Sequence, residues 1–233
     1  MTDAPFCVVI AGPNGSGKTT LTRSLIDAGV DFGIHIDPDE IARTLDLPEP
    51  QRSAQAQQIA DFKRDVCLQR RDSFSFETVM SHPSKIELMV RAHDAGYDIT
   101  VYFVATVDPE INVRRVENRV SLGGHDVPHD RIRKRYWRSL GYLAHAALVA
   151  RRTVAFDNSA LIGAAIRTGG IPEAGGLRPV AEVIADGNSY DVRVGADAPA
   201  WVQHFLGRPL VDIGHASEGG LTVVVHPAEG PLA

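Results

Sequence analysis

The residues with the clearest capacity for chemistry form a glycine-rich loop near the start of the chain. Between Gly12 and Thr19 the sequence reads GPNGSGKT, which fits the pattern of glycine, four variable residues, glycine, lysine, and serine or threonine. The apolar run Phe6–Ala11 precedes the loop, and an amphipathic stretch from Lys18 to about Ala28 follows it. Backbone N–H groups in such a strand–loop–helix unit turn towards phosphate oxygens, and glycines permit the backbone angles this needs. The pattern predicts a site for a nucleoside triphosphate with Mg²⁺.

Each position of the loop has an expected role. Lys18 is expected to reach the β- and γ-phosphates, and the hydroxyl of Thr19 is expected to ligate Mg²⁺. The start of the following helix adds unpaired N–H groups and the positive end of its dipole. The residues expected to bind the nucleotide are Gly12, Pro13, Asn14, Gly15, Ser16, Gly17, Lys18, Thr19 and Thr20.

Other classes of triphosphate-binding protein are disfavoured because their motifs are missing. The chain has no Asn-Lys-x-Asp segment, which GTPases use to read guanine, and no apolar run ending in Asp-Glu to activate a hydrolytic water. The stretch Ser121–His125 scrambles the order of the Leu-Ser-Gly-Gly-Gln signature of transporter ATPases. This elimination favours a small kinase that uses ATP as its phosphoryl donor.

A kinase also needs a group that takes the proton of the acceptor hydroxyl. The segment IDPDE at Ile36–Glu40 follows an apolar run, so its carboxylates should emerge beside the phosphate loop. Asp39 is the expected catalytic base and acceptor contact, although a carboxylate in a first helical turn is also stabilised by the helix dipole. Asp37 is open to two interpretations, as the helix N-cap before Pro38 or as an outer partner of Mg²⁺.

Glu77 and Thr78 follow another β-type run, Ser73–Phe76, at the end of the expected strand. The carboxylate of Glu77 could hold an acceptor hydroxyl or help orient Mg²⁺, or it could be a solvated residue at the edge of the sheet. Ligands of open parallel sheets bind beyond the carboxyl ends of the strands, which is where these side chains fall.

Seven arginines and one lysine lie within Arg114–Leu140, where few acidic residues could pair with them. Guanidinium groups bind phosphate oxygens through two parallel hydrogen bonds, so this segment is expected to form a lid whose arginines fold over the transferring phosphoryl group. The usual alternative is a solvated charged face. His125 and Asp126 could take part in closure or simply form a turn. Helical spacing predicts two rows across a break at Gly123-Gly124, namely Arg115 with Arg119, and Arg131 with Arg135 and Arg138.

These residues need a scaffold, and the chain alternates β-type runs with helical periodicities over about its first 160 residues. Such alternation predicts βαβ units and a mainly parallel sheet with helices on both faces. One helix is expected over Arg52–Arg71 and another over Lys85–Ala95, with Ser84 and Glu87 as a capping box and Gly96 as the stop. The expected strands are Phe6–Ala11, Phe32–Ile36, Ser73–Phe76, Ile99–Ala105 and Thr153–Phe156.

The alternation of strands and helices stops after this region and the composition changes. We therefore expect a kinase core at 1–160 and a C-terminal extension at 161–233, either separate from the core or packed on it. Gly163–Gly176 has the composition of a linker. A hairpin is expected from Val180–Ile184 and Tyr190–Val194, then a short helix over Pro199–Leu206. The tail contains one β-like run, Leu221–Val225, which the sequence does not place.

The composition of the chain indicates which classes of binding partner are not favoured. The 233 residues carry a formal net charge of −5 with 44% hydrophobic and 23% charged residues, so nothing global favours nucleic acid or a membrane surface as partner. No export signal precedes Phe6, and a cytoplasmic location is expected. Cys7 and Cys67 lie among apolar neighbours and are expected to be small buried thiols. No histidine has metal-ligand spacing, so no structural metal is expected.

With the loop, IDPDE, FET at Phe76–Thr78 and the arginine segment in this order, the chain resembles the zeta-toxin family of P-loop kinases. It is most similar to the zeta-like branch whose lid reads Gly-Gly-His-x-Val-Pro, here Gly123–Pro128, and the likeness runs from about Phe6 to Ser159. The resemblance implies a three-layer α/β sandwich. It also implies ATP-dependent phosphorylation of a hydroxyl of UDP-N-acetylglucosamine, and an epsilon-type antitoxin protein as partner.

The resemblance also implies roles for single residues. The family's loop lysine corresponds to Lys18, its catalytic base to Asp39, and its substrate-contacting glutamate to Glu77. Thr78 lies close to a contacting threonine. One lid arginine corresponds approximately to Arg119 and the second to one of Arg131, Arg133 and Arg135, of which we choose Arg135; an acidic residue of the family has an approximate counterpart in Asp61.

Two other interpretations stay open at the level of sequence. The chain could be a regulatory ATP-binding module that acts on a protein partner through its C-terminal extension, or a resistance-type kinase that phosphorylates a drug hydroxyl. The lid differs from that of the established toxins, and residues 163–233 have no clear counterpart in them. Both differences concern the acceptor and the biological role rather than the phosphoryl chemistry.

Overall fold

The structure is a computed structural model that describes residues 4–124, 126–159, 176–217, 220–228 and 232. His125 and all of the expected linker except Gly176 lie outside these residues. The expectations for His125 and for the linker therefore stay predictions.

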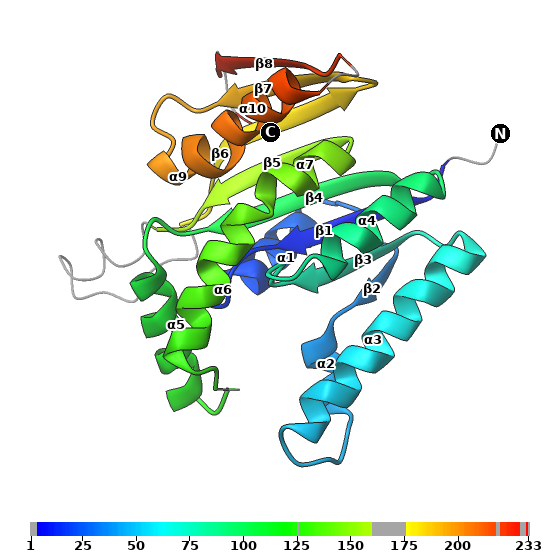
Figure 1. The fold of residues 1–233 in the computed structure, drawn as a ribbon. Helices are drawn as coiled ribbons and strands as arrows, with labels where there is room; N and C mark the ends of the chain where they lie inside the picture. The colour runs from blue at the N-terminus through cyan, green and yellow to red at the C-terminus, as the bar shows by residue number, and fades with distance from the viewer. Residues whose placement is uncertain (1–3, 125, 160–175, 218–219, 229–231, 233) are drawn as a thin grey trace.

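The strands form one eight-stranded sheet with the order β2-β3-β1-β4-β5-β6-β7-β8 (Figure 1). The first five strands pair in parallel, β6 pairs antiparallel with β5 and β7, and β8 pairs in parallel with β7. The expected α/β class with a mainly parallel sheet is confirmed. The strands are β1 (Phe6–Ala11), β2 (Ile34–Ile36), β3 (Phe74–Thr78), β4 (Asp98–Ala105), β5 (Arg152–Asp157), β6 (Arg178–Asp186), β7 (Ser189–Val194) and β8 (Thr222–Pro227).

Helices cover both faces of this sheet, because the strand residues alternate between two apolar layers. On one face Val8 and Ile10 of β1 pack with Leu21 of α1. On the other face Val9 of β1 and Phe76 of β3 belong to a larger core built with α3, α4, α7 and the C-terminal helices. The helices are α1 (Lys18–Asp27), α2 (Pro38–Arg43), α3 (Gln51–Arg70), α4 (Ser84–Asp94), α5 (Pro109–Ser121), α6 (His129–Gly141), α7 (Leu143–Val149), α9 (Ala200–Val202), a π-helical turn (Gln203–Gly207) and α10 (Arg208–Ala216).

Two pairs of helices flank the carboxyl end of the central strands. In Figure 1 the α2–α3 pair and the α5–α6 pair lie on opposite sides of α1. α5 and α6 share a small core of their own, formed by Val113, Val116, Val127 and Ile132. Asp39, expected to act on the acceptor, and the arginines of the expected lid therefore lie on different helix pairs, on either side of α1.

The C-terminal region continues the sheet. Trp201, Leu206 and Leu210 are buried in the same core as β1 and β4. The helix expected over Pro199–Leu206 is shorter than the helical segment that the structure shows. That segment runs from α9 through the π-helical turn into α10. Gly207 and Pro209 resemble a helix stop in sequence, but Pro209 lies in the first turn of α10, where no N–H is needed. The run that the sequence does not place is β8, which pairs with β7.

The beginning of α4 also differs from the expectation. Ser84 and Glu87 do not form a capping box, because the N-cap position is Pro83 and no side chain caps the helix. The hydroxyl of Ser84 lies 3.0 Å from Nδ1 of His82 instead. The stop at Gly96 is confirmed by its left-handed φ of 79°.

The two cysteines, Cys7 and Cys67, are both buried and form no disulfide bond.

Within the described ranges, none of the helices is long and apolar enough to cross a membrane.

Candidate active site

The phosphate loop connects the buried end of β1 to the first turn of α1. Gly17 takes the N-cap position of α1 with φ of 104°, a left-handed conformation that side chains rarely adopt. A Cβ on Gly17 would also come within 2.2 Å of Nδ2 of Asn158. The loop therefore requires glycine at this position for its backbone angle and for its close contact with the strand β5 side of the site.

Lys18 lies inside the curve of the loop. Its Nζ donates hydrogen bonds of 3.1 Å to the carbonyl oxygens of Gly12 and of Pro13. Burial lowers the pKa of Lys18. A cation that is held by two backbone carbonyls at the N-terminus of a helix is a suitable counter-charge for phosphate oxygens.

Four charged residues act electrostatically on this ammonium group. Glu77, Asp39 and Asp37 act on Lys18 by raising its pKa, and Arg119 acts by lowering it. These effects require the four side chains to lie within electrostatic range of Nζ. The fold therefore brings the end of β3, the start of α2 and the end of α5 to one centre.

The carboxylates of IDPDE have different environments. Asp37 is the N-cap of α2, and its Oδ1 accepts a hydrogen bond of 2.9 Å from the backbone N–H of Asp39. Burial raises the pKa of Asp37, the N–H of Asp39 opposes this rise, and the carboxylates of Asp39, Glu77 and Glu40 add to it. Asp39 is exposed, in the first turn of α2. Asp37 thus has a structural task, whereas Asp39 is accessible to a substrate.

Glu77 and Thr78 point to opposite faces of the sheet, as successive strand residues do. Oε1 of Glu77 accepts a hydrogen bond of 2.6 Å from the hydroxyl of Thr22 on α1. The buried Thr78 accepts a hydrogen bond of 3.0 Å from the N–H of Met80. Glu77 therefore belongs to the phosphate-loop face, and Thr78 to the face covered by α3 and α4.

The arginines of the expected lid have three different destinations. Arg135 approaches the phosphate loop, with Nη1 lying 3.5 Å from Oδ1 of Asn14, and burial lowers its pKa with a further contribution from Arg131. Arg133 points away and pairs with Glu110 at 2.6 Å. Arg115 donates a hydrogen bond of 2.8 Å to the carbonyl of Asn158. Helical spacing would place Arg115 beside Arg119, and Arg119 is the one of the two whose charge lowers the pKa of Lys18.

Several residues that support the loop were not predicted from the sequence. Nδ2 of the buried Asn112 on α5 donates a hydrogen bond of 2.7 Å to the carbonyl of Asn14, and its Oδ1 accepts a hydrogen bond from Thr106. Nδ2 of Asn158 donates one of 2.8 Å to the carbonyl of Ser16. No local motif signals these contacts. The only cue is that Asn158 directly follows a buried strand.

Thr19 and Thr20 follow Lys18 in the first turn of α1 and are exposed. A hydroxyl in that position is free to ligate Mg²⁺ held by a triphosphate on the loop. Among the described residues, no group of three or more His, Cys, Asp and Glu side chains could hold a metal ion. The donor set therefore fits a Mg²⁺ that arrives with the nucleotide better than a cage built by the protein.

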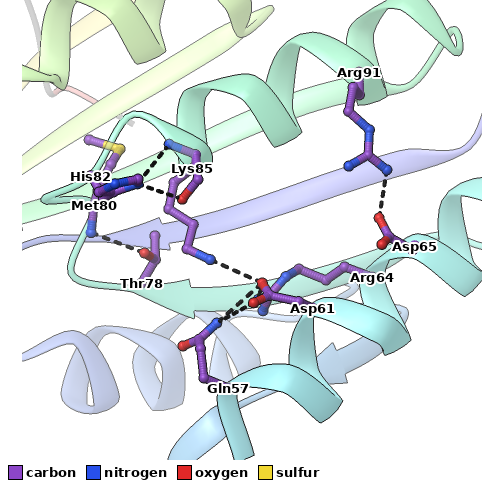
Figure 2. A network of polar contacts seen from close by, with 10 residues as sticks. Gln57, Asp61, Arg64, Asp65, Thr78, Met80, His82, Lys85 and Arg91 are labelled. Carbon is purple, nitrogen blue, oxygen red and sulfur yellow. Dashed lines mark hydrogen bonds and ion pairs between the residues drawn. The ribbon is translucent and has the colours of Figure 1, made fainter. Parts of the chain in front are cut away.

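Asp61, the approximate counterpart of a family acid, lies on α3. Its Oδ1 contacts Nη2 of Arg64 and lies 3.2 Å from Nζ of Lys85 (Figure 2). Burial acts to raise the pKa of Asp61, but Arg64, Lys85 and Gln57 together outweigh it, and the pKa is lowered.

Comparison with known proteins gives a family and a fold. The sequence model of the zeta toxin family matches residues 2–158. An uncharacterized protein of Haemophilus influenzae is 31% identical over 132 residues, which cover 55% of this chain and 91% of that protein.

Among solved structures, the complex of AvrRxo1-ORF1 and AvrRxo1-ORF2 with ATP has a TM-score of 0.56 at 15% identity. The match covers 77% of this chain and 58% of that chain, which is less than two thirds of the latter. The PezAT chromosomal toxin–antitoxin system of Streptococcus pneumoniae has a TM-score of 0.48 at 15% identity and covers 67% of this chain and 68% of that one.

Proposed function

Because the chain belongs to the zeta toxin family, we propose that it is an ATP-dependent phosphotransferase that moves the γ-phosphoryl group of ATP to a hydroxyl of a small molecule. The observation that carries the proposal is the cluster around Lys18. Asp39, Glu77 and Arg119, which come from three different elements, lie within electrostatic range of the lysine of a phosphate-binding loop and shift its pKa. A loop that only bound nucleotide would not need an exposed carboxylate at this centre.

In the proposed reaction the acceptor oxygen forms a bond with the γ-phosphorus as the bond from phosphorus to the β–γ bridging oxygen breaks, and ADP leaves. Asp39 accepts the proton of the acceptor hydroxyl. Glu77 orients that hydroxyl from the end of β3. Lys18, Arg119 and Arg135 stabilise the charge on the transferring group and on the leaving oxygen. The attraction between these preorganised cations and the phosphoryl oxygens grows as negative charge develops in the transition state.

Mg²⁺, when bound with ATP, would neutralise part of the phosphate charge. Thr19 would supply its hydroxyl to the ion. One oxygen of Asp37 accepts a hydrogen bond from the N–H of Asp39. Only its other oxygen would therefore be available to act as an outer partner of the ion.

The acceptor that we propose is UDP-N-acetylglucosamine or a related sugar nucleotide, on the basis of the family resemblance. A protein partner of the antitoxin kind is proposed as well. It is supported by the family, and the AvrRxo1-ORF1 structure with a similar fold is itself a complex with AvrRxo1-ORF2.

The direct test is to incubate the protein with Mg-ATP and UDP-N-acetylglucosamine and to look for a phosphorylated sugar nucleotide by mass spectrometry. The same assay on a pool of metabolites and on hydroxylated drugs would separate other acceptors, including the resistance-type alternative. The regulatory alternative predicts tight ATP binding without turnover of any acceptor.

Asp39→Asn tests the proposed base. Loss of general-base catalysis should lower kcat by about 10²–10⁴-fold while the affinity for a non-hydrolysable ATP analogue stays nearly unchanged. Glu40→Gln is the matched control, because Glu40 is an exposed carboxylate in the same turn of α2. An Asp39→Asn enzyme as active as the Glu40→Gln enzyme would show that the base is another residue.

A further inference from the structure

One side of α6 faces solvent and takes no part in the proposed function. Four exposed residues share this side, because the last three stand three, four and seven positions after the first along the helix. We call them the outer face of α6: Lys134, Trp137, Arg138 and Gly141. Tyr136 and Leu140 of the same helix are buried in the core, and Arg135 approaches the phosphate loop. The outer face therefore lies outside both the core and the proposed active site.

The outer face is basic, although the chain as a whole is acidic. α6 contains five arginines and lysines but one acidic residue, Asp130, whereas the whole chain has a formal net charge of −5. Asp130 lies 3.6 Å from Arg133. Within the described part of the chain, neither Lys134 nor Arg138 forms an ion pair. Two exposed cations without acidic neighbours attract a negatively charged partner.

Trp137, between these two cations, is an exposed aromatic residue that other rings hold in position. It is 53% exposed. The ring of Tyr136 meets it edge-on with 4.9 Å between the centroids, and the ring of Phe205 lies 6.1 Å away. Phe205 comes from the π-helical turn Gln203–Gly207, and such turns are frequent at functional sites. An aromatic side chain that is ordered before binding contacts a partner at a small cost in entropy.

Gly141 leaves space beside this indole. It follows Trp137 by four residues, so the two positions are neighbours on the helix surface. A Cβ at Gly141 would meet nothing within 4 Å, so no packing contact requires glycine there. The helix backbone is therefore open next to the ring of Trp137, and an apolar side chain of a partner can pack against both.

We propose that the outer face of α6 binds an acidic segment of a partner protein. Carboxylates of the segment pair with Lys134 and Arg138, and an apolar side chain packs between Trp137 and Gly141. Tryptophan and arginine are enriched among the residues that contribute most to the affinity of protein interfaces. The inference goes beyond the proposed function and does not depend on it, because no step of the proposed phosphoryl transfer uses this face.

The charges favour a polypeptide over a nucleic acid as the partner. Lys134 and Arg138 stand about 6 Å apart along the helix axis, which suits a pair of carboxylates but is too short for a run of phosphates. The net charge of −5 also repels a long polyanion from the molecule as a whole. One ordered tryptophan flanked by two cations therefore matches a short segment that is both acidic and apolar.

Binding of a synthetic peptide tests the outer face independently of catalysis. The probe is a short fluorescein-labelled peptide of repeated Glu-Leu-Glu-Glu units, titrated with the protein and followed by fluorescence anisotropy. We expect saturable binding that weakens as salt is added. The affinity should be about tenfold lower for Trp137→Ala and for Lys134→Glu. Phe62→Ala and Lys63→Glu are the matched controls, because Phe62 and Lys63 are exposed side by side on α3, and both should bind like the native protein.

Two further measurements separate a specific contact from general attraction between charges. A peptide with glycine in place of leucine should bind about tenfold more weakly, because the apolar contact with Trp137 is lost. The leucine peptide should shift the emission of Trp137 to shorter wavelength, since Trp201 is already buried. The proposal is overturned if the native protein shows no saturable binding, if the control variants lose as much affinity as Trp137→Ala and Lys134→Glu, or if a single-stranded oligonucleotide binds this face in preference to the peptide.

Discussion

Thr22 on α1 donates a hydrogen bond of 2.6 Å to Oε1 of Glu77 at the end of β3. The same hydroxyl also lies 3.1 Å from the carbonyl of Lys18, one turn earlier in α1. Glu77 in turn is the carboxylate with the largest effect on the pKa of Lys18. The helix expected to bind the phosphates and the strand expected to face the acceptor are therefore fixed relative to each other through one buried threonine.

Thr22→Val should separate positioning from binding. The variant keeps the shape of the side chain but leaves Glu77 without its neutral donor, so the carboxylate can turn away from the acceptor. We expect kcat to fall by about tenfold, and the free energy of unfolding to fall by about 1 kcal/mol, for one lost hydrogen bond. Steady-state kinetics and thermal unfolding measure these effects. The affinity for an ATP analogue should stay within about twofold, since the phosphate loop is unchanged.

Thr44→Val is the control for this variant, because Thr44 is exposed at the end of α2 and its hydroxyl bonds only to the backbone of Ile41. It should leave kcat unchanged. Equal kcat values for Thr22→Val and the native enzyme would mean that Glu77 needs no such support.

Asp37 gives a prediction on pH dependence. Its pKa is raised in the folded chain, chiefly by burial. A carboxyl group of this kind stabilises the fold below its ordinary pKa of 3.8 and loses that contribution as the pH rises through the raised value. Asp37→Asn should therefore raise the free energy of unfolding at pH 7, because asparagine keeps the N-cap while the charge beside Asp39 and Glu77 is removed. This gain should vanish as the pH falls below 3.8.

Thermal unfolding of the native protein and the variant across this pH range measures the difference. Asp108→Asn is the matched control, because Asp108 caps α5 with the same hydrogen bond to the residue two positions on. Glu110, the acidic residue two positions on, is paired with Arg133, so no comparable gain is expected. A stability of Asp37→Asn that falls below the native value at pH 7 would contradict the prediction.

The parts of the site that sequence could predict are those encoded by neighbouring residues. The loop from Gly12 to Thr19 follows from its own spacing. The cap at Asp37 follows from the proline after it, and the position of Glu77 follows from the end of a β-type run. In each case the strand end, the turn and the functional group lie within a few residues, so local pattern and final position coincide.

What sequence did not predict are contacts between distant segments. The hydrogen bond between Thr22 and Glu77 joins residues 55 positions apart, and that between Asn112 and Asn14 joins residues 98 positions apart. Helical spacing also could not tell that Arg133 would face Glu110, because periodicity gives a face but not its partner. The C-terminal helix α10 was missed for a local reason, the Gly207–Pro209 pattern, which the buried core overrides.

Asn112 is the clearest of these unforeseen supports. Asn112→Ala would leave the carbonyl of Asn14 without its donor, and the hydroxyl of Thr106 would keep only the carbonyl of Asp108 as an acceptor. Buried groups left without a partner cost about 1–3 kcal/mol, so the melting temperature should fall by several degrees. The affinity for ATP should fall by about tenfold, because the loop is no longer held in its binding conformation. Isothermal titration with an ATP analogue measures this loss.

Asn118→Ala is the control for this change, because Asn118 is an exposed asparagine on the same helix. It should bind the analogue like the native protein. Equal affinities for Asn112→Ala and Asn118→Ala would show that the loop holds its conformation without help from α5.

Arg135 and Arg133 lie two residues apart on α6 and allow the expected lid to be tested with a matched pair. Arg135 approaches Asn14 of the phosphate loop, whereas Arg133 pairs with Glu110 on the outside of α5. Arg135→Met should lower kcat by about 10²-fold or more, since arginines that fold over a transferring phosphoryl group contribute up to about 10³–10⁵ in rate. Arg133→Met should leave kcat unchanged and cost about 0–1 kcal/mol of stability, as expected for an exposed ion pair. Single-turnover kinetics at saturating ATP separates the chemical step from binding, and a larger loss of kcat in Arg133→Met than in Arg135→Met would assign the lid arginine to the other position.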